Sequence, residues 1–237
     1  NLREFLYGKK VLVTGHTGFK GTWLTLWLLM HGAKVYGYSL PPDLKQPFFD
    51  ELFMTNNSSK HLIGELFHNE GDINDFETLS NFVKDVKPQL VFHLAAQPLV
   101  QKSYKYPIET WKTNVIGSIN LLESLKLLKN QCAAIFITTD KVYENKEWVY
   151  GYREIDNLGG NDPYSSSKAA MELAIKSWRS SFCGLKPHQT SYISIATARA
   201  GNVIGGGDWS EDRIIPDIVR ALKNNETIKI RNPNARR

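Results

Sequence analysis

Cysteine is scarce in this chain, at two of 237 residues, Cys132 and Cys183. Two cysteines are too few to staple a chain of this length with disulfides, and neither belongs to a CxxC motif or to a cluster with histidine. The sequence therefore predicts neither a disulfide-stabilised fold nor a bound metal. A reducing cytoplasm is the expected location.

Long hydrophobic runs are also missing. The longest, Trp23–Met30, is interrupted by Thr25 and is far shorter than the roughly 20 apolar residues that a membrane-spanning helix needs. The apolar run Val11–Val13 follows two lysines, but it leads into a glycine-rich turn without the small-residue cleavage site of a signal peptide. We expect no membrane span and interpret Val11–Val13 as part of a strand.

No long block of one charge occurs either. The formal net charge is +5, but lysine and arginine are scattered among acidic residues, which argues against a nucleic-acid partner. A mild positive excess suits an enzyme that binds anionic pyrophosphates. The 42% hydrophobic and 22% charged residues are near the globular average, so the chain is able to bury a substantial core.

Short β-branched runs alternate with longer amphipathic runs along the chain. This alternation predicts an α/β fold of the Rossmann type, a doubly wound and mainly parallel sheet with helices on both faces, because parallel strands need crossovers that helices supply. We expect residues 1–200 to form this domain and residues 201–237 to begin a smaller substrate lobe that is cut short. In the first expected helix, Trp23, Leu24, Trp27, Leu28 and Met30 are expected against the sheet. The expected strands are Val11–Thr14, Lys34–Tyr38, Phe67–Glu70, Leu90–Leu94, Ala134–Thr138, Ile193–Ala198 and a short Ile228–Ile230, and the first and last expected helices are Gly21–His31 and Ile215–Asn224.

A glycine-rich segment follows the first expected strand and opens the first helix. Its GxxGxxG spacing lets the backbone approach a pyrophosphate, whose negative charge is favoured by the free N–H groups and the dipole at a helix N-terminus. Strand, loop and helix together predict a dinucleotide site. Its expected contacts are Gly15, Thr17, Gly18, Phe19, Lys20 and Gly21.

The end of the second expected strand bears on which dinucleotide binds. The acidic residue that hydrogen-bonds the ribose, expected about 20 residues after the glycines, is missing, and Tyr38-Ser39-Leu40 stands there. Ser39 is able to hydrogen-bond a ribose hydroxyl, and no arginine is present at the strand end to bind the 2′-phosphate of NADP. We therefore favour NAD as the cofactor.

A tyrosine and a lysine four residues apart form the expected catalytic pair. Tyr164 and Lys168 fall on one face of a helix that begins after Pro163. Tyrosine has a reference pKa of about 10 and is a poor base, but a nearby ammonium favours its phenolate. Tyr164 is the expected base, with Lys168 lowering its pKa. A core tyrosine beside a solvated lysine is the alternative.

The glycine loop and the YxxxK pair resemble the extended short-chain dehydrogenase/reductase family, which comprises NAD-dependent epimerases and dehydratases. Within it, Thr139-Asp140-Lys141 after the fifth expected strand resembles the sugar-nucleotide 4,6-dehydratases, of which those acting on dTDP-glucose or GDP-mannose carry glutamate where this chain has Lys141. The Asp-Lys pair is similar to the CDP-glucose branch, although it would also suit a loop salt bridge. Further agreement with this branch comes from Glu144–Trp148, Gly151–Glu154, Arg199–Trp209 and Arg213–Asp217.

This resemblance implies an NAD-dependent hydro-lyase that converts CDP-glucose to CDP-4-keto-6-deoxyglucose and water. Tyr164, assisted by Thr139, would take the C4 hydroxyl proton while a hydride passes to NAD, and the resulting ketone makes the C5 proton acidic. Lys141 would remove that proton while Asp140 protonates the departing C6 hydroxyl, and the hydride would return to C6. Glu144 is the alternative base if Lys141 is solvated.

The resemblance also implies contacts to cofactor and substrate. Asp72 would contact adenine, although it would equally serve to cap the helix expected at Phe76–Lys84, and Lys168 would bind the nicotinamide ribose. Further expected cofactor contacts are Ile73, Leu94, Ala95, Ala96, Gln97, Thr138 and Tyr164. The expected substrate contacts are Gln97, Asn114, Arg199, Asn202 and Arg213. The bidentate donors of Arg213 suit the pyrophosphate, whereas Arg199 would equally suit an internal salt bridge.

Two other functions remain open from the sequence. A nucleotide-sugar 4-epimerase shares the cofactor loop and the tyrosine–lysine pair, but it needs no acid and base beside C5 and C6, so Asp140 and Lys141 argue against it. A catalytically silent nucleotide-binding module is the other alternative. Because this family usually pairs through helices, we expect a homodimer or a dimer of dimers.

Overall fold

A six-stranded parallel sheet forms the centre of the protein. The computed structural model describes residues 1–55, 62–183, 192–230 and 233, and its strands follow the order β3-β2-β1-β4-β5-β6. The strands are β1 Lys10–Thr14, β2 Lys34–Ser39, β3 Glu65–Glu70, β4 Leu90–His93, β5 Cys132–Ile137 and β6 Ile193–Ala198. The strand order reverses at β1, and sheets of this kind bind ligands at the carboxyl ends of the strands beside such a reversal.

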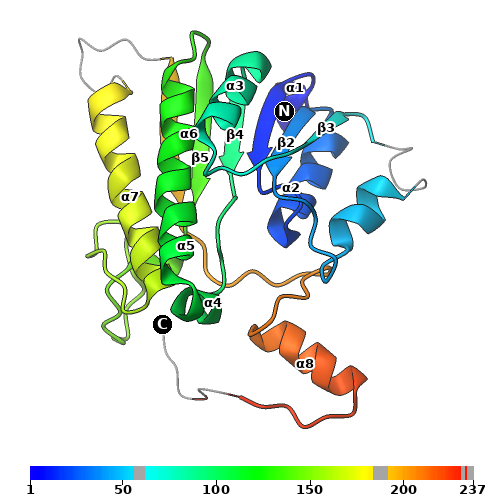
Figure 1. Cartoon of the computed structure of the whole chain (residues 1–237), viewed down its shortest axis with the longest axis vertical. Coiled ribbons are helices and arrows are strands. Elements are labelled where there is room, and N and C mark those ends of the chain that lie inside the picture. The colour runs from blue at the N-terminus through cyan, green and yellow to red at the C-terminus, as the bar shows by residue number, and fades with distance from the viewer. Residues whose placement is uncertain (56–61, 184–191, 231–232, 234–237) are drawn as a thin grey trace.

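Helices connect the strands and cover both faces of the sheet (Figure 1). The α-helices are α1 Leu2–Leu6, α2 Phe19–Met30, α3 Phe76–Val86, α4 Val100–Lys105, α5 Pro107–Trp111, α6 Gly117–Lys126, α7 Pro163–Phe182 and α8 Ile214–Lys223. Two short π-helical segments, η1 Asp50–Met54 and η3 Lys112–Ile116, and a 3-10 turn, η4 Asp140–Val142, complete the described helical elements. α2 packs on one face of the sheet, whereas α3, α6 and α7 pack on the other.

Alternate residues of β1 contribute to two hydrophobic cores. Leu12 joins the core beneath α3, α6 and α7, which also contains Leu121 and Met171. Val11 and Val13 join the core beneath α2. Because both faces are buried, β1 is apolar along most of its length, as expected for a parallel sheet covered on both sides.

The predicted fold class is confirmed, and the six predicted strands of the sheet are present with ends that differ by at most two residues. The seventh predicted strand is wrong. Residues 228–230 form no strand, and Ile228 and Ile230 are 40% and 56% exposed. β-branched residues favour a strand only where a neighbouring strand and a packed surface receive them.

The predicted orientation of α2 is right for Leu24 and Leu28, which pack in the core beneath the helix, and wrong for Trp23, Trp27 and Met30, which are exposed. Its buried stripe includes Thr25, Leu28 and Leu29, whereas Trp23 and Trp27 are 43% and 40% exposed. The Trp23 indole instead donates a hydrogen bond to the carbonyl oxygen of Gly206 at 2.9 Å. Helix α2 therefore presents an aromatic side chain, Trp23, to the segment that follows β6.

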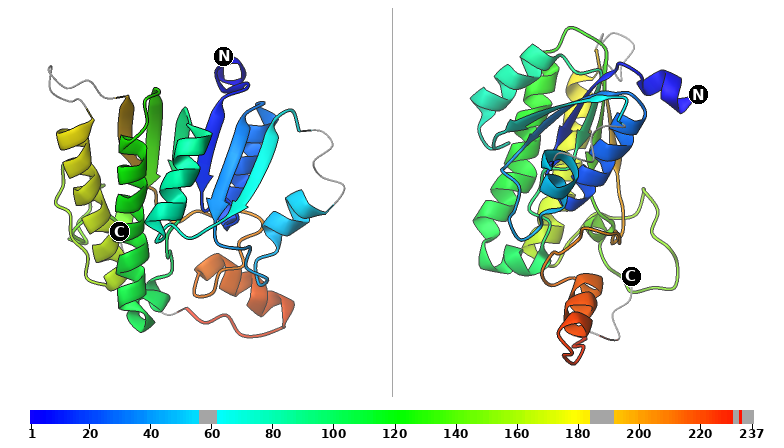
Figure 2. Two further views of the ribbon diagram at one scale, coloured as in Figure 1. Left: turned by 45° about the horizontal axis from the view of Figure 1, so that its top comes forward. Right: turned by 90° about the vertical axis from the view of Figure 1, so that its right-hand side faces the viewer.

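The segment after β6 and helix α8 lie beyond the carboxyl edge of the sheet (Figure 2). This is the edge at which ligands bind in such folds. Among the described residues, no helix has the length and apolar character to span a membrane. Within the same ranges, no group of three or more His, Cys, Asp or Glu residues is arranged to hold a metal ion.

Candidate active site

The glycine loop between β1 and α2 combines two glycines that the fold requires with one that it does not. Gly15 has a φ of +73°, and a Cβ there would lie 2.7 Å from the backbone nitrogen of Ala95. A Cβ at Gly21 would lie 2.0 Å from the carbonyl oxygen of Gly15. Gly18, in contrast, has an extended backbone, and its Cβ would approach no atom closer than 3.4 Å.

Gly18 is the N-cap of α2, and no side chain caps this helix end. The first turn of α2 also contains no acidic residue. The absent side chain at Gly18 therefore leaves the backbone N–H groups of the helix open to an anionic group. This arrangement fits the pyrophosphate of a dinucleotide, with Thr17, Phe19 and Lys20 beside it.

The carboxyl end of β2 places Ser39 next to the glycine loop. The hydroxyl oxygens of Ser39 and Thr17 are 2.8 Å apart, and both side chains also reach the carbonyl oxygen of Leu40 at 3.1 Å. Ser39 is thus held at the position where a ribose contact is predicted. A dinucleotide whose pyrophosphate lies at Gly18 would meet this pair of hydroxyls.

The structure distinguishes between the two roles predicted for Asp72, contact with adenine and capping of α3. Asp75, rather than Asp72, caps α3 by accepting a hydrogen bond from the backbone N–H of Thr78 at 3.1 Å. The Asp72 carboxylate instead accepts hydrogen bonds from the backbone and side chain of Asn74. The capping role of Asp72 is therefore wrong, and the adenine contact of Asp72 and Ile73 stays a prediction.

Gln97 and Asn114 hold the loop after β4, which differs from their predicted contact with substrate. The Asn114 side chain accepts from the backbone N–H of Gln97 at 2.8 Å and donates to its carbonyl oxygen at 3.2 Å and to Ser167 at 2.9 Å. The Gln97 amide is bonded to Leu99 and Thr110. Asn114 is fully buried and Gln97 is 9% exposed, so their polar atoms are occupied within the protein. They fix the shape of the segment that contains Leu94, Ala95 and Ala96.

Tyr164 lies in the first turn of α7, and its hydroxyl hydrogen-bonds the side chain of Thr139. Burial raises the pKa of Tyr164, and the bond to Thr139 and the charge of Arg213 only partly offset this rise. The expected lowering by a neighbouring ammonium is therefore not the dominant effect in the protein alone. Tyr164 is protonated at neutral pH and is held beside the residue predicted to assist it.

Lys168 is 4% exposed and lies one helical turn after Tyr164. Its amine donates to the carbonyl oxygen of Ile137 at 3.2 Å. Burial, together with the positive charge of Lys20, lowers the pKa of Lys168 to about 7. An amine with this pKa carries only part of a positive charge near neutral pH.

Asp140 and Lys141 begin the 3-10 turn that follows β5. The Lys141 amine lies 3.4 Å from the Asp140 carboxylate and 3.1 Å from the side-chain oxygen of Asn202. Asp140 also accepts a hydrogen bond from Thr139 at 3.1 Å. The ion pair that was the alternative interpretation is thus present, but it belongs to a cluster with Thr139 and the predicted substrate contact Asn202.

Glu144 is not placed like a second base. It forms an ion pair with Lys146 at 2.5 Å, and this hydrogen bond and charge lower the pKa of its carboxyl. Its side chain is 46% exposed, and it is absent from the lining of the cavity described below. Lys141, whose side chain is only 14% exposed, is the better placed of the two candidates.

Arg199 forms an internal ion pair. Its guanidinium makes two bonds to the Glu172 carboxylate, at 3.0 and 3.1 Å, and a third to the carbonyl oxygen of Glu154. The bonds to Glu172 outweigh burial and raise the pKa of Arg199. This geometry favours the second of the two roles left open for Arg199.

Glu172 is a central residue that the sequence analysis missed. It is 5% exposed and also accepts hydrogen bonds from Thr138 at 2.5 Å and Thr197 at 3.1 Å. It therefore ties α7 to β6 and to Thr138, the residue that follows β5. Its position four residues after Lys168, on the same helical face, is the signal that would have identified it.

A cavity of about 660 Å³ opens where these residues meet. Its lining includes Lys20, Thr139, Lys141, Tyr164, Asn202 and Arg213. Burial and the positive charge of Arg213 lower the pKa of Lys20, whereas Asp208, which is 3.3 Å from Arg213, opposes this. The volume is in the usual range for small-molecule sites. The lining contains acidic residues as well as basic ones, and Lys20, Lys141 and Arg213 are the cations able to meet an anionic group of a ligand.

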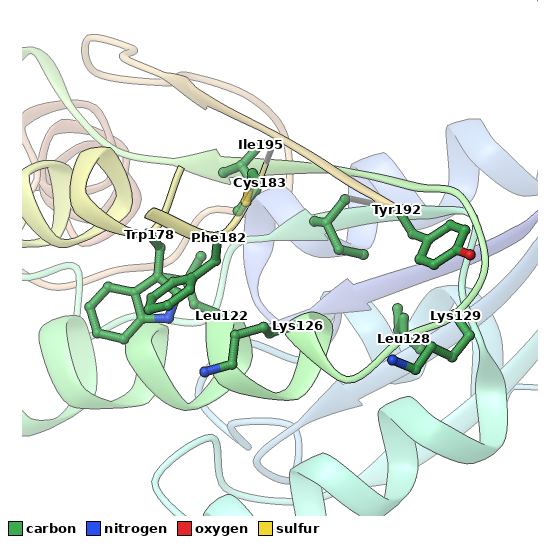
Figure 3. A pocket seen from close by; sticks show the side chains of 10 residues that line it. Leu122, Lys126, Leu128, Lys129, Trp178, Phe182, Cys183, Tyr192 and Ile195 are labelled. Carbon is green, nitrogen blue, oxygen red and sulfur yellow. The ribbon is translucent and has the colours of Figure 1, made fainter. Parts of the chain in front are cut away.

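A second, smaller cavity lies between α6, α7 and β6 (Figure 3). Its volume is about 130 Å³, and its walls include Leu122, Trp178 and Ile195. None of the predicted site residues lines it, and it is smaller than typical ligand sites. The larger cavity is therefore the candidate active site.

Known proteins share both the sequence pattern and the fold. A CDP-glucose 4,6-dehydratase from Salmonella typhimurium is 48% identical to this chain over 231 residues, which cover 98% of this chain and 62% of that protein. The structure of an epimerase from Methanothermobacter thermautotrophicus matches with a TM-score of 0.76 at 24% identity, covering 95% of this chain and 62% of that one. A dTDP-glucose 4,6-dehydratase from Bacillus anthracis, solved in complex with NAD, matches with a TM-score of 0.71 at 21% identity, covering 93% and 63% of the two chains.

The chain thus spans less than two thirds of the length of these relatives. The two structural matches agree with the parallel sheet order and support the Rossmann-type fold. The family model described as GDP-mannose 4,6 dehydratase matches residues 12–233, from β1 to beyond α8. This match covers nearly the whole chain, including the glycine loop and the tyrosine–lysine pair, and it shows that the chain belongs to the GDP-mannose 4,6 dehydratase family.

Proposed function

We propose that the protein with this chain is an NAD-dependent CDP-glucose 4,6-dehydratase, which converts CDP-glucose to CDP-4-keto-6-deoxyglucose and water. The observation that carries the proposal is the grouping of Thr139, Asp140 and Lys141 beside Tyr164, with Lys141 lining the cavity. The 48% identity to a protein named for this activity supports the choice of substrate. A 4-epimerase would not need an acid and a base beside the tyrosine.

The proposed cofactor is NAD. The open helix end at Gly18 would receive its pyrophosphate, and Ser39 with Thr17 would meet the adenosine ribose. Asp72 and Ile73 would contact adenine, the segment from Leu94 to Ala96 would line the nicotinamide side, and Lys168 would bind the nicotinamide ribose. NAD bound in this way would accept a hydride from C4 of the sugar and later supply it to C6.

The residues around C4 supply a proton acceptor for the oxidation step. The Tyr164 hydroxyl would take the proton of the C4 hydroxyl, and Thr139, already hydrogen-bonded to Tyr164, would orient the same oxygen. Tyr164 is 8% exposed and lines the cavity, so its side chain is accessible to the sugar from that side. Because burial raises the pKa of Tyr164, cationic groups at the cavity, including Arg213, are needed to favour its deprotonated form.

The elimination step would use Lys141 and Asp140. A ketone at C4 makes the C5 proton acidic, so Lys141 would remove it while Asp140 protonates the departing C6 hydroxyl. Lys141 must be neutral to accept a proton. The positive charge of nearby Lys20 favours the neutral amine, whereas the Asp140 carboxylate at 3.4 Å favours the ammonium. Asn202 would hold the Lys141 amine in place through the 3.1 Å hydrogen bond.

We also propose that residues 201–237 begin the substrate lobe. Asn202, Arg213 and residues of α8 line the cavity opposite the sheet. Arg213 would bind the pyrophosphate of the substrate, since its guanidinium supplies bidentate donors. A homodimer or a dimer of dimers is the proposed assembly, which sedimentation velocity would test.

Incubation with a panel of nucleotide sugars tests the proposal. The protein, supplied with NAD, would be given CDP-, dTDP-, UDP- and GDP-linked hexoses, and products would be identified by mass and by the alkali-induced absorbance of a 4-keto sugar. CDP-glucose should give a product lighter by one water. A product of unchanged mass that is epimeric at C4 would support the 4-epimerase instead. If no sugar gave a product, the result would support the catalytically silent nucleotide-binding module.

A further inference from the structure

A line of hydrogen-bonding side chains connects the end of β2 with the edge strand β3. The hydroxyl oxygen of Ser39 lies 3.1 Å from Nδ1 of His16, and Nε2 of His16 lies 2.6 Å from Nδ1 of His68. On the far side of His68, Nε2 lies 3.8 Å from the Glu70 carboxylate. The line thus begins at a residue proposed to meet the cofactor and ends at an exposed negative charge.

The sheet is built to hold this line. Gly37 pairs with His68 and Ser39 pairs with Glu70 in the parallel register of β2 and β3, so these four positions lie on one face of the sheet. A Cβ at Gly37 would lie 2.3 Å from the His16 ring. Gly37 is therefore the residue that makes room for the imidazole.

An aromatic ring covers the two histidines. The ring of Phe49 is fully buried and packs against His16 and His68 with centroid separations of 5.1 and 5.2 Å. His16 itself has no exposed surface. Because water is excluded from His16, its two ring nitrogens depend on Ser39 and His68 for hydrogen bonds.

The Glu70 carboxylate at one end of the line determines which ring nitrogen of each histidine carries a proton. Burial lowers the pKa of His16 to about 3, so His16 carries one ring proton at neutral pH. In a neutral His68, Glu70 favours the proton on the nearer nitrogen, Nε2, and Nδ1 is then an acceptor. His16 then donates from Nε2 and accepts at Nδ1, and the single Ser39 hydroxyl proton goes to His16 rather than to the carbonyl oxygen of Leu40, which lies at the same distance of 3.1 Å.

We infer that His68, acting through His16, fixes Ser39 as a hydrogen-bond acceptor toward the cofactor and thereby selects NAD over NADP. The inference rests on the proposed function, in which the adenosine ribose lies at Ser39. A ribose 2′-hydroxyl donates a proton to an acceptor, whereas a 2′-phosphate offers only acceptor oxygens. His16 and His68 are positioning residues that give a neutral serine the acceptor character which an acidic side chain usually supplies at this place.

Nitrogen NMR of the protein labelled at histidine tests the order of the protons without any ligand. His16 should carry its proton on Nε2 in the wild type. In His68→Phe the acceptor for that proton is lost, so the His16 proton should move to Nδ1 and the Ser39 hydroxyl should be released. A wild-type His16 that carries its proton on Nδ1 would overturn the inference.

Dinucleotide binding, measured by calorimetry, tests the selectivity. His68→Phe should bind NAD about 3- to 10-fold more weakly, which is the loss expected for one neutral hydrogen bond. Its affinity for NADP should not decrease. The ratio of the NAD affinity to the NADP affinity should therefore become smaller. Glu70→Gln, which keeps both rings, should change the preference in the same direction by less. Glu65→Gln is the matched control on β3, because Glu65 pairs with Lys34 at 3.1 Å outside the line, and it should leave both affinities unchanged.

The outcomes separate the inference from the function on which it rests. An unchanged NAD preference in both His68→Phe and Glu70→Gln, with normal NAD binding in the wild type, would overturn the inference alone. Failure of the wild type to bind either dinucleotide would refute the proposed cofactor site and the selectivity with it. The position of the His16 proton would still be measured independently in that case.

Discussion

Replacing Lys168 by methionine should stabilise the protein near neutral pH while abolishing the proposed activity. Lys168 is almost fully buried, and burial lowers the pKa of its amine to about 7. Methionine is flexible, apolar and of similar length, so it fills the same space without a charge. The variant loses the hydrogen bond from the amine to the carbonyl oxygen of Ile137 but avoids burying an ammonium.

The pKa shift of Lys168 sets the size of the effect. A decrease from 10.5 to about 7 corresponds to at most about 5 kcal/mol, at about 1.4 kcal/mol per unit. An unmade hydrogen bond at Ile137 offsets about 1–3 kcal/mol of this. Near pH 6, where the buried amine is charged, Lys168→Met should therefore raise the free energy of unfolding by about 2–4 kcal/mol.

The difference in the free energy of unfolding between Lys168→Met and the wild type should become smaller as the pH rises. Between pH 7 and 10.5 the unfolded chain binds more protons at Lys168 than the folded chain does. The wild type therefore becomes more stable as pH rises through this window, and the advantage of the variant shrinks by about 3 kcal/mol by pH 9. Below about pH 7 the cost of the buried charge is fully present.

Urea unfolding from pH 6 to 9, followed by tryptophan fluorescence, measures this difference. Lys176→Met is the matched control, because Lys176 lies on the same helix and is exposed, and it should not alter the pH dependence. The reasoning would be refuted if Lys168→Met were less stable than the wild type near pH 6. A stability difference that stays constant from pH 6 to 9 would refute it equally.

Three further predictions concern the catalytic residues and their support. Tyr164→Phe should bind NAD normally but give no NADH with CDP-glucose, and NADH formation at the wild-type rate would exclude Tyr164 as the base. Lys141→Ala should still oxidise C4, but C5 deuterium exchange from heavy water should fall by about 10²–10⁴; unchanged exchange would place the base elsewhere. Glu172→Gln should lower the free energy of unfolding by about 3–5 kcal/mol, because it leaves Arg199 without its buried carboxylate. A loss below about 1 kcal/mol in urea titrations would show that the pair contributes little.

The six strands of the sheet were predictable from the sequence, whereas the side of α2 that faces the sheet was predicted only in part. The strands of the sheet are short apolar runs bounded by polar or glycine-rich segments, and this pattern is local. Nearly every residue of Trp23–Met30 is apolar, so the helix has no polar face to indicate which side meets the sheet. Only the tertiary contact of Trp23 with Gly206 reveals that the tryptophan side faces outward.

In the candidate site, too, some residues were predictable from the sequence and others were not. The glycine loop and the pair Tyr164 and Lys168 are encoded by spacing within one turn or one helix, so the sequence alone identifies them. The roles of Asn114 and Arg199 depend on partners 17 and 27 residues away, and a hydrogen bond between such distant residues leaves no local pattern. The pairing of His16 with a residue 52 positions later was invisible for the same reason.

Gly37 and His16 cannot be exchanged independently. Any side chain at position 37 would occupy the volume of the imidazole, since its Cβ would lie 2.3 Å from the ring, so a larger residue there requires a smaller one at position 16. The two positions should therefore covary among relatives, and engineering of the cofactor site should vary them together in one library. The combination of histidine directly after the first glycine with glycine two residues before the end of β2 would then serve as a marker for chains that contain the same buried imidazole.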